Sequence, residues 1–244
     1  MARFLLLVSI VFCSCQKDVI EKLDTAKLDT AKLDYGKVDY GKVDTATLNT
    51  AKLDTFSIKT EKDKLRFDAF KTHIKAFKTL NNAKVAFVLS VAENARLESS
   101  VSNIPVSLYV AMAIQETGWG TSKAYNEGFS LGNIKYYSEN NLALAKLKND
   151  YPDAKFSKIN IHDDSAKDMF VLYENQEQAL RHISYNLQGK YISYCKNHHN
   201  VYDWFKALQA KDPQKGKYAW ATDKRYIKKL TKIVQKYRLY LLDI

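Results

Sequence analysis

The chain has 244 residues, enough for one sizeable domain with a hydrophobic core and for further segments beside it. Its 38 Lys and Arg outnumber its 27 Asp and Glu, which gives a formal net charge of +11. We therefore expect an anionic partner: nucleic acid, anionic lipid or an anionic cell-wall polymer. No run of residues approaches the ~20 apolar residues of a membrane-spanning helix, so we expect none.

The start of the chain is typical of an export signal. Arg3 precedes a mostly apolar run from Phe4 to Phe12 that is too short to span a bilayer as a helix. The run leads into Ser14 and Cys15, and a small residue directly before a cysteine at this place resembles a bacterial lipoprotein signal. By that resemblance residues 1–14 are a signal peptide and Cys15 carries a lipid. The exported chain would then be anchored to a bacterial membrane, with the outer membrane facing the periplasm as the favoured site. An ordinary secretory signal cut nearby is the alternative.

A five-residue unit such as Lys-Leu-Asp-Thr-Ala repeats from Lys22 to Phe56. A period of five matches neither the helical period of 3.6 nor the strand period of 2, so it predicts no continuous amphipathic element. The unit also resembles the pentapeptide-repeat family, whose members form a four-sided β-helix, but too few units are present to stack a continuous core. We therefore interpret residues 15–59 as a lipid anchor with a flexible stalk, and residues 60–244 as the folded domain.

At the start of the domain, the spacing of apolar residues predicts two helices, which are separated at Asn81-Asn82. The first apolar stripe comprises Leu65, Phe67, Phe70, Ile74 and Phe77, and the second comprises Val85, Phe87, Val88, Val91, Ala92 and Leu97. We expect both helices to be scaffold that packs on the helix that follows them.

That next stretch, Ser102 to Ser122, carries Glu116 as its single formal charge. Pro105 suits the first turn of a helix, and Gly118 and Gly120 stop the helix soon after the carboxylate. Apolar residues on every face predict a helix that runs through the core. A carboxylate held there would have its charged form disfavoured and its pKa raised, as a general acid near neutral pH requires. A buried glutamate paired with Lys or Arg is the alternative.

In the middle of the domain, the sequence predicts a partly helical segment on the surface. A small antiparallel hairpin or three-stranded lobe follows it. Residues Lys155 to Ile161 alternate apolar and polar side chains, and Met169 to Tyr173 are rich in strand formers. The acidic turn between them supplies candidates for a second catalytic carboxylate, which are Asp163, Asp164 and Asp168, together with Glu139, Asp150 and Asp153 elsewhere. The alternative is that these are ordinary acidic surface residues.

The remaining third is helical by its periodicity. Asn175 can cap one helix, Val201 to Ala210 form a second, and Thr222 or Asp223 can cap a last helix that extends to Leu242. The polar face of that last helix is basic, with Lys224, Arg225, Lys228, Lys229 and Lys232. It would either attract an anionic polymer or simply be solvated.

Metal and cofactor chemistry are disfavoured by the residues available. Only Cys195 would remain free in the mature domain, which excludes a disulfide framework and a cysteine-based metal site. His198 and His199 have only Cys195 and Asp203 nearby as further ligands, so we expect no metal. We expect no cofactor either.

Three segments, in this order, resemble the bacterial glucosaminidases of glycoside hydrolase family 73, in the Bax-type branch. They are AIQETGWGTS from Ala113, FVLYENQEQA from Phe170 and ATDKRYIKKL from Ala221. The resemblance implies a mainly α (α+β) fold over residues 60–244, with a lysozyme-like helical core and a small antiparallel β-lobe. It implies cleavage of peptidoglycan at the β-1,4 bond between N-acetylglucosamine and N-acetylmuramic acid.

The resemblance also implies roles for residues. Glu116 matches the catalytic acid, and Trp119 matches a tryptophan that would form a wall of the cleft. The second carboxylate would lie in the β-lobe, at Asp163, Asp164 or Asp168.

The segment from Phe129 to Lys135 departs from the family's Asn-Asn-Leu-Phe-Gly-Ile-Lys, since Phe129-Ser130 replace the Asn pair and Gly132-Asn133 replace Phe-Gly. The cleft tyrosine before Ala-Thr-Asp falls on Trp220, with Tyr218 two residues earlier. Substrate binding is accordingly expected at Trp119, Phe129, Tyr218, Trp220 and Tyr226.

Two alternatives stay open at this point. A lytic transglycosylase also works with one glutamate in a lysozyme-like core and would leave anhydro-muramic ends. A wall-binding lipoprotein could keep the fold without turnover, as the departures at Phe129-Ser130 and Trp220 would allow. Nucleic acid is disfavoured as a partner by the export signal. We expect a monomer that binds glycan strands of peptidoglycan and a membrane through its lipid.

Overall fold

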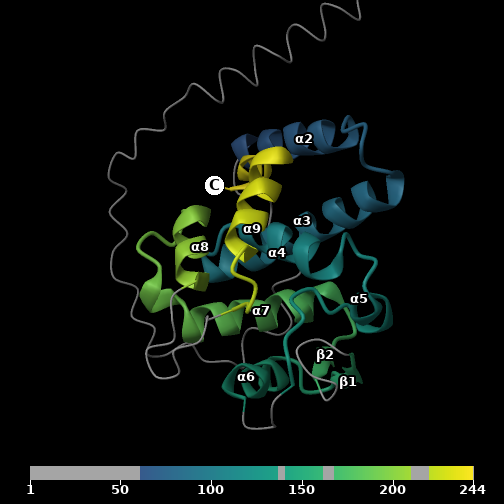
Figure 1. Ribbon diagram of the computed structural model, residues 1–244, viewed down its shortest axis with the longest axis vertical. Coiled ribbons are helices and arrows are strands. Elements are labelled where there is room, and N and C mark those ends of the chain that lie inside the picture. The colour runs from purple at the N-terminus through teal and green to yellow at the C-terminus, as the bar shows by residue number, and fades with distance from the viewer. Residues whose placement is uncertain (1–60, 137–140, 162–167, 210–219, 244) are drawn as a thin grey trace, which may run out of the picture. The chain divides into compact units, whose positions relative to one another are not determined.

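The computed structural model describes residues 61–136, 141–161, 168–209 and 220–243 (Figure 1). The predicted signal peptide, Cys15 and the stalk lie outside the described residues, as do Glu139, Asp163, Asp164 and Tyr218. In the part that is described, no helix is both long enough and apolar enough to cross a membrane.

The described elements are mostly helices, with one small sheet. In chain order they are α2 (Glu61–Lys75), α3 (Asn82–Ser102), α4 (Val106–Thr117), α5 (Lys123–Gly128), α6 (Leu142–Asp150), β1 (Ser157–Asn160), β2 (Met169–Leu172), α7 (Gln176–Lys190), the 3-10 turn η2 (Ile192–Tyr194), α8 (Val201–Gln209), α9 (Tyr226–Lys236) and the 3-10 turn η3 (Leu239–Leu242). The predicted class, mainly helical with a small antiparallel lobe, is confirmed.

Helix α4 lies at the centre of the core. It packs against α3, α8, α9 and η3, and in Figure 1 the yellow α9 crosses close to it. Leu108, Tyr109 and Met112 are completely buried. A helix that is apolar on every side can be stable only when neighbours cover every side, and here they do.

Helices α2 and α3 pack on this core as predicted, with two exceptions. Phe70 and Ile74 on α2 are completely buried, whereas Leu65 is 60% exposed. On α3, Val88 is completely buried and Leu97 is 51% exposed. At 100° per residue, Leu65 and Leu97 lie on the opposite sides of their helices from the buried stripes, so their hydrophobicity did not predict burial.

Helix ends follow local capping. Asn81 accepts a hydrogen bond from the backbone N–H of Lys84 at the start of α3. Asn175 accepts one from Gln178 at the start of α7, which confirms the predicted cap. Each side chain satisfies one of the N–H groups that a first helical turn leaves without an intrahelical partner.

The last helix differs from its prediction at both ends. Its start is Tyr226, because Asp223 uses its carboxylate to accept the N–H of Arg225 in a turn that precedes α9. Arg238 has a left-handed backbone (φ 50°), which ends the helix and leads into η3. The chain turns at Arg238 so that Leu239 and Leu242 can enter the core, where both are buried.

The predicted hairpin is present as an antiparallel pair. Strands β1 and β2 pair with Ser157 opposite Leu172 and Asn160 opposite Met169. A single bridge adds Lys135 beside Phe170. The lobe is therefore two-stranded, with one extra contact from the segment that follows α5.

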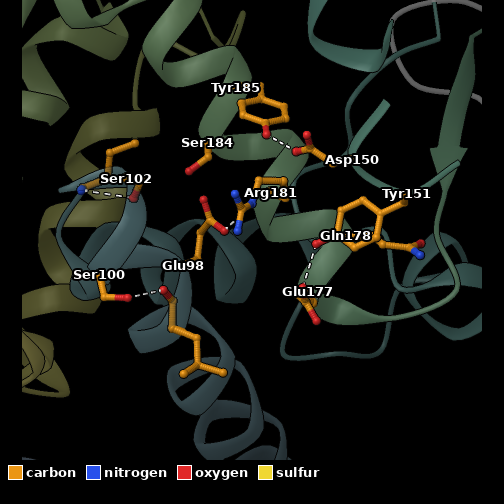
Figure 2. Close-up of polar contacts among 12 residues, drawn as sticks. Glu98, Ser100, Ser102, Asp150, Tyr151, Glu177, Gln178, Arg181, Ser184 and Tyr185 are labelled. Carbon is orange, nitrogen blue, oxygen red and sulfur yellow. Dashed lines mark hydrogen bonds and ion pairs between the residues drawn. The ribbon is translucent and has the colours of Figure 1, made fainter. Parts of the chain in front are cut away.

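A buried ion pair connects α3 to α7 (Figure 2). Glu98 is 3% exposed, and its Oε2 lies 2.8 Å from Nε of Arg181. Burial raises the pKa of Glu98, and the positive charge of Arg181 opposes that shift. Figure 2 also shows Tyr185 directed toward Asp150, whose carboxylate accepts its hydroxyl, so the same network links α6 to α7. The glutamate that is buried in an ion pair is thus Glu98 on α3.

The end of the chain caps the start of α4. Pro105, at the N-cap position, has no side-chain atom that can accept a hydrogen bond from the first turn of α4, so the usual N-cap acceptor is missing. Asp243 supplies the acceptor instead. Its Oδ1 accepts the N–H of Ser107 at 2.8 Å, and its Oδ2 accepts the Ser107 hydroxyl at 2.6 Å. The carbonyl of Asp243 in turn accepts from Nη1 of Arg66 on α2 at 2.9 Å. One C-terminal residue therefore joins α2, η3 and the central helix.

Replacing Asp243 with alanine should destabilise the domain by about 1–3 kcal/mol, because a helix cap is lost and a buried N–H is left without an acceptor. Urea denaturation followed by circular dichroism measures this change. Asp243→Asn is the matched control, since its amide oxygen can still accept from Ser107, and it should lose clearly less. Equal stability of wild type and Asp243→Ala would contradict the proposed capping.

Candidate active site

The candidate site lies where α4 ends. Gly118 takes a left-handed backbone (φ 56°) and its N–H bonds to the carbonyl of Ile114, which closes the helix. Gly120 is also left-handed (φ 77°), and a Cβ there would come within 2.5 Å of the Phe87 ring. These two glycines stop the chain from continuing as a helix. As a result Glu116 stands on the last turn of α4, partly exposed, at the end of an otherwise buried helix.

A tyrosine from the far end of the chain contacts this carboxylate. The hydroxyl of Tyr226, the first residue of α9, donates to Oε1 of Glu116 at 2.7 Å. Tyr226 is 5% exposed, and burial together with the charge of Glu116 raises its pKa well above the ordinary value. The phenol therefore stays protonated and acts as the donor. Sequence comparison predicted Tyr226 as a substrate-binding residue, and the structure places it against the candidate acid.

An asparagine holds the same glutamate from another side. Nδ2 of Asn133 donates to the backbone carbonyl of Glu116 at 2.8 Å and approaches Oε2 at 3.3 Å. That carbonyl belongs to the last turn of α4, where carbonyls lack an intrahelical partner. Asn133 has a left-handed backbone (φ 44°), which asparagine tolerates better than most residues.

Sequence analysis missed this role of Asn133. The signal was the Gly132-Asn133 pair, which stands where the family has Phe-Gly. A glycine in the family at this point fits the left-handed backbone, and the asparagine adds a donor that glycine lacks.

Asp168 is the described member of the predicted second-acid set in the lobe. Its Oδ2 lies 3.0 Å from Nζ of Lys135, and both side chains are 16% exposed. This ion pair joins the start of β2 to the segment that carries Asn133. Of the other candidates, Asp150 accepts from Tyr185 and Asp153 is exposed on the surface. The roles suggested for Asp163 and Asp164 stay predictions.

The predicted aromatic residues do not all lie beside Glu116. Trp220 is next to the site: its side chain partly opposes the rise in the pKa of Tyr226, and its ring centroid lies 5.7 Å from that of Tyr191. Trp119 instead packs edge-on against Tyr237, with ring centroids 4.8 Å apart. Its role as a wall of the cleft stays a prediction.

Phe129 lies beyond α5, at its C-cap, with a left-handed backbone (φ 48°). Phe129 is 39% exposed, and its ring centroid lies 5.9 Å from that of Tyr125. An exposed aromatic ring at this point is available to a ligand, and its predicted role in substrate binding stays a prediction.

No group of three or more His, Cys, Asp or Glu side chains among the described residues is arranged to hold a metal ion. The groups that the structure brings together at this site are the carboxylate of Glu116, the phenol of Tyr226 and the amide of Asn133.

Two solved structures are similar to the chain. The catalytic domain of the autolysin Auto from Listeria monocytogenes is 19% identical with a TM-score of 0.46, over 74% of this chain and 97% of that one. An N-acetylmuramoyl-L-alanine amidase from Staphylococcus aureus is 21% identical with a TM-score of 0.45, over 68% of this chain and 44% of that one. No curated protein matches the chain significantly.

A family model, by contrast, matches most of the domain. It is the glucosaminidase model, described as mannosyl-glycoprotein endo-β-N-acetylglucosaminidase, and it covers residues 92–239. The match spans Glu116, Asn133, Asp168 and Tyr226. The chain therefore belongs to the glucosaminidase family and is a glycoside hydrolase that cleaves peptidoglycan between N-acetylglucosamine and N-acetylmuramic acid.

Proposed function

We propose that Glu116 is the general acid that protonates the leaving oxygen of the β-1,4 bond. The observation that carries the proposal is the pair of donors on this carboxylate: Tyr226 at Oε1 and Asn133 at the main chain and Oε2. A catalytic acid must be held at a fixed place relative to the glycosidic oxygen, and positioned donors do this. Among the residues of α4, only Glu116 carries a carboxylate.

The hydrogen bonds also distinguish the two carboxylate oxygens. The short bond from Tyr226 occupies Oε1, whereas Oε2 receives only the long 3.3 Å contact from Asn133. Oε2 is accordingly the oxygen that carries the proton to the leaving group. With the phenol held on Oε1, the acid keeps its orientation when the proton is transferred and Glu116 becomes a carboxylate.

The second half of the reaction requires a group that attacks or stabilises the anomeric carbon. This can be a carboxylate nucleophile, a carboxylate about 6.5–9.5 Å away that activates water, or the N-acetyl group of the substrate. Asp163 and Asp164 are the preferred carboxylates, because the charge of Asp168 is already compensated by Lys135. A carboxylate paired with a lysine is a weaker base than the same carboxylate without that cation.

The setting proposed for this enzyme is outside the cytoplasm, on a membrane. The apolar run before Cys15 supports lipid anchoring, and the stalk up to residue 59 would let a monomer reach glycan strands.

Glu116→Gln should abolish the release of reducing sugars from purified peptidoglycan, because an amide has no proton of suitable acidity to transfer. The loss should be about 100-fold or more, within the range that a positioned acid supplies. The circular dichroism spectrum and thermal midpoint should stay those of a folded protein, since glutamine has the same shape. Unchanged turnover would refute the assignment.

Tyr226→Phe removes one hydroxyl and keeps the ring, so it tests the donor alone. We expect kcat to fall roughly tenfold or more, since a hydrogen bond to a charged group is lost. The alkaline limb of the pH–rate profile should move to higher pH, because the ionised carboxylate loses a donor that stabilises it. A purely structural role for Tyr226 would leave that limb in place.

Asn133→Gly is the companion variant, because glycine accepts the left-handed backbone at this position and removes only the side-chain donor. It should lower kcat less than Tyr226→Phe, since its contact to Oε2 is the longer of the two. A larger loss in Asn133→Gly than in Tyr226→Phe would reverse the ranking of the two donors.

Lipid anchoring makes a separate prediction. When the full chain is expressed in a bacterium with a labelled fatty acid, the label should appear in the protein, and Cys15→Ser should abolish it, since serine has no thiol to carry the lipid. Cys13→Ser is the matched control and should keep the label. Label that survives in Cys15→Ser would point to another site, and its absence in the wild type would favour an ordinary secretory signal.

A further inference from the structure

Helix α9 and the turn before it present a row of basic side chains to solvent. We name this set the α9 stripe, and it comprises Lys224, Arg225, Lys228, Lys229, Lys232 and Lys236. All are exposed except Lys229, which is partly exposed. From Arg225 onward their spacing of three and four residues places them on one side of the helix. The opposite side carries Tyr226, Leu230 and Val234, all buried.

Little negative charge compensates this row. Asp223 is the carboxylate paired with it, at 2.7 Å from Lys229 and 3.7 Å from Arg225. Within the described residues, Lys224, Lys228 and Lys232 form no ion pair. An ordinary solvated helix face mixes both signs, because like charges at this spacing repel one another. A row of one sign is therefore a feature that an anionic ligand would stabilise.

The stripe begins at the candidate active site. Tyr226, whose hydroxyl contacts Glu116, is the first residue of α9. Arg225 directly precedes it and Lys229 follows one turn later, so these cations lie at the end of the helix that meets the acid. From Arg225 to Lys236 the helix rises about 16 Å. The charges thus run along the solvent side of the helix whose first residue, on its buried side, contacts the acid.

Peptidoglycan carries carboxylates at regular intervals along its strand, as the α9 stripe carries cations along the helix. The sugar rings of peptidoglycan are neutral, whereas the peptides attached to successive muramic acid residues have free carboxylates. A strand with one bond at Glu116 would place the peptides of its neighbouring units along the surface next to the site. We propose that the α9 stripe binds the carboxylates of these stem peptides. The proposal rests on Glu116 as the reacting centre, and it adds the peptide as a recognised part of the substrate.

The test measures binding, so it is independent of turnover. In the full chain carrying Glu116→Gln, the stripe variant combines Lys224→Gln, Lys228→Gln and Lys232→Gln. Its affinity for purified sacculi freed of phosphate polymers should fall about tenfold at low ionic strength, as expected for three exposed ion pairs of ordinary strength. The difference should disappear in 1 M salt, where the Debye length is about 3 Å.

The control variant removes the same number of charges elsewhere. It combines Lys64→Gln, Lys148→Gln and Lys196→Gln, three exposed lysines on other parts of the surface. Its affinity should fall clearly less than that of the stripe variant, since charges elsewhere on the surface act only through the long-range field and make no direct ion pair with the stem peptides. A second control uses sacculi whose carboxylates have been converted to amides with a carbodiimide and ammonia. On these the stripe variant and its parent should bind equally.

The outcomes separate the possible explanations. Equal losses in the two lysine variants, or a loss that persists on amidated sacculi, would overturn the proposal. A loss on phosphatidylglycerol vesicles with none on sacculi would assign the stripe to a membrane and overturn it too. Sugar release by the Glu116→Gln parent would refute the assignment of the acid instead, and would be seen in the same samples.

Discussion

The burial of α4 on all sides is the constraint on which the rest of the structure depends. A helix covered by α3, α8, α9 and η3 cannot shift or rotate without opening the core, so its two ends are fixed in space. Asp243 closes one end and Gly118 closes the other. Glu116 gains its position from this, since it occupies the last turn before the helix must stop.

The site is completed by parts of the chain that are distant in sequence. Asn133 arrives from the segment that enters the lobe, and Tyr226 arrives at the start of α9. The ion pair between Lys135 and Asp168 connects the asparagine to strand β2. One donor is tied to the lobe and the other to the core.

Local signals predicted much of this fold, and tertiary packing decided the rest. Gly118 and Asn175 act through their own backbones or neighbours, so the end of α4 and the start of α7 could be predicted. The delayed start of α9, the turn at Arg238 and the role of Asn133 depend on contacts with remote residues, which no local pattern contains. At the candidate site the place of Glu116 at the end of an apolar helix could be predicted from the sequence, and its role as the acid came from the family resemblance and stays a prediction, whereas its asparagine donor was not predicted.

The most direct test of the account is the dependence of Glu116→Gln on the leaving group. A general acid matters when the departing oxygen needs a proton, and matters little when dinitrophenolate leaves unaided. The variant should be compared with wild type on a natural glycan and on a matching glycan with a dinitrophenyl leaving group. The account predicts a large loss on the first and a much smaller loss on the second. Equal losses on both would contradict proton donation by Glu116.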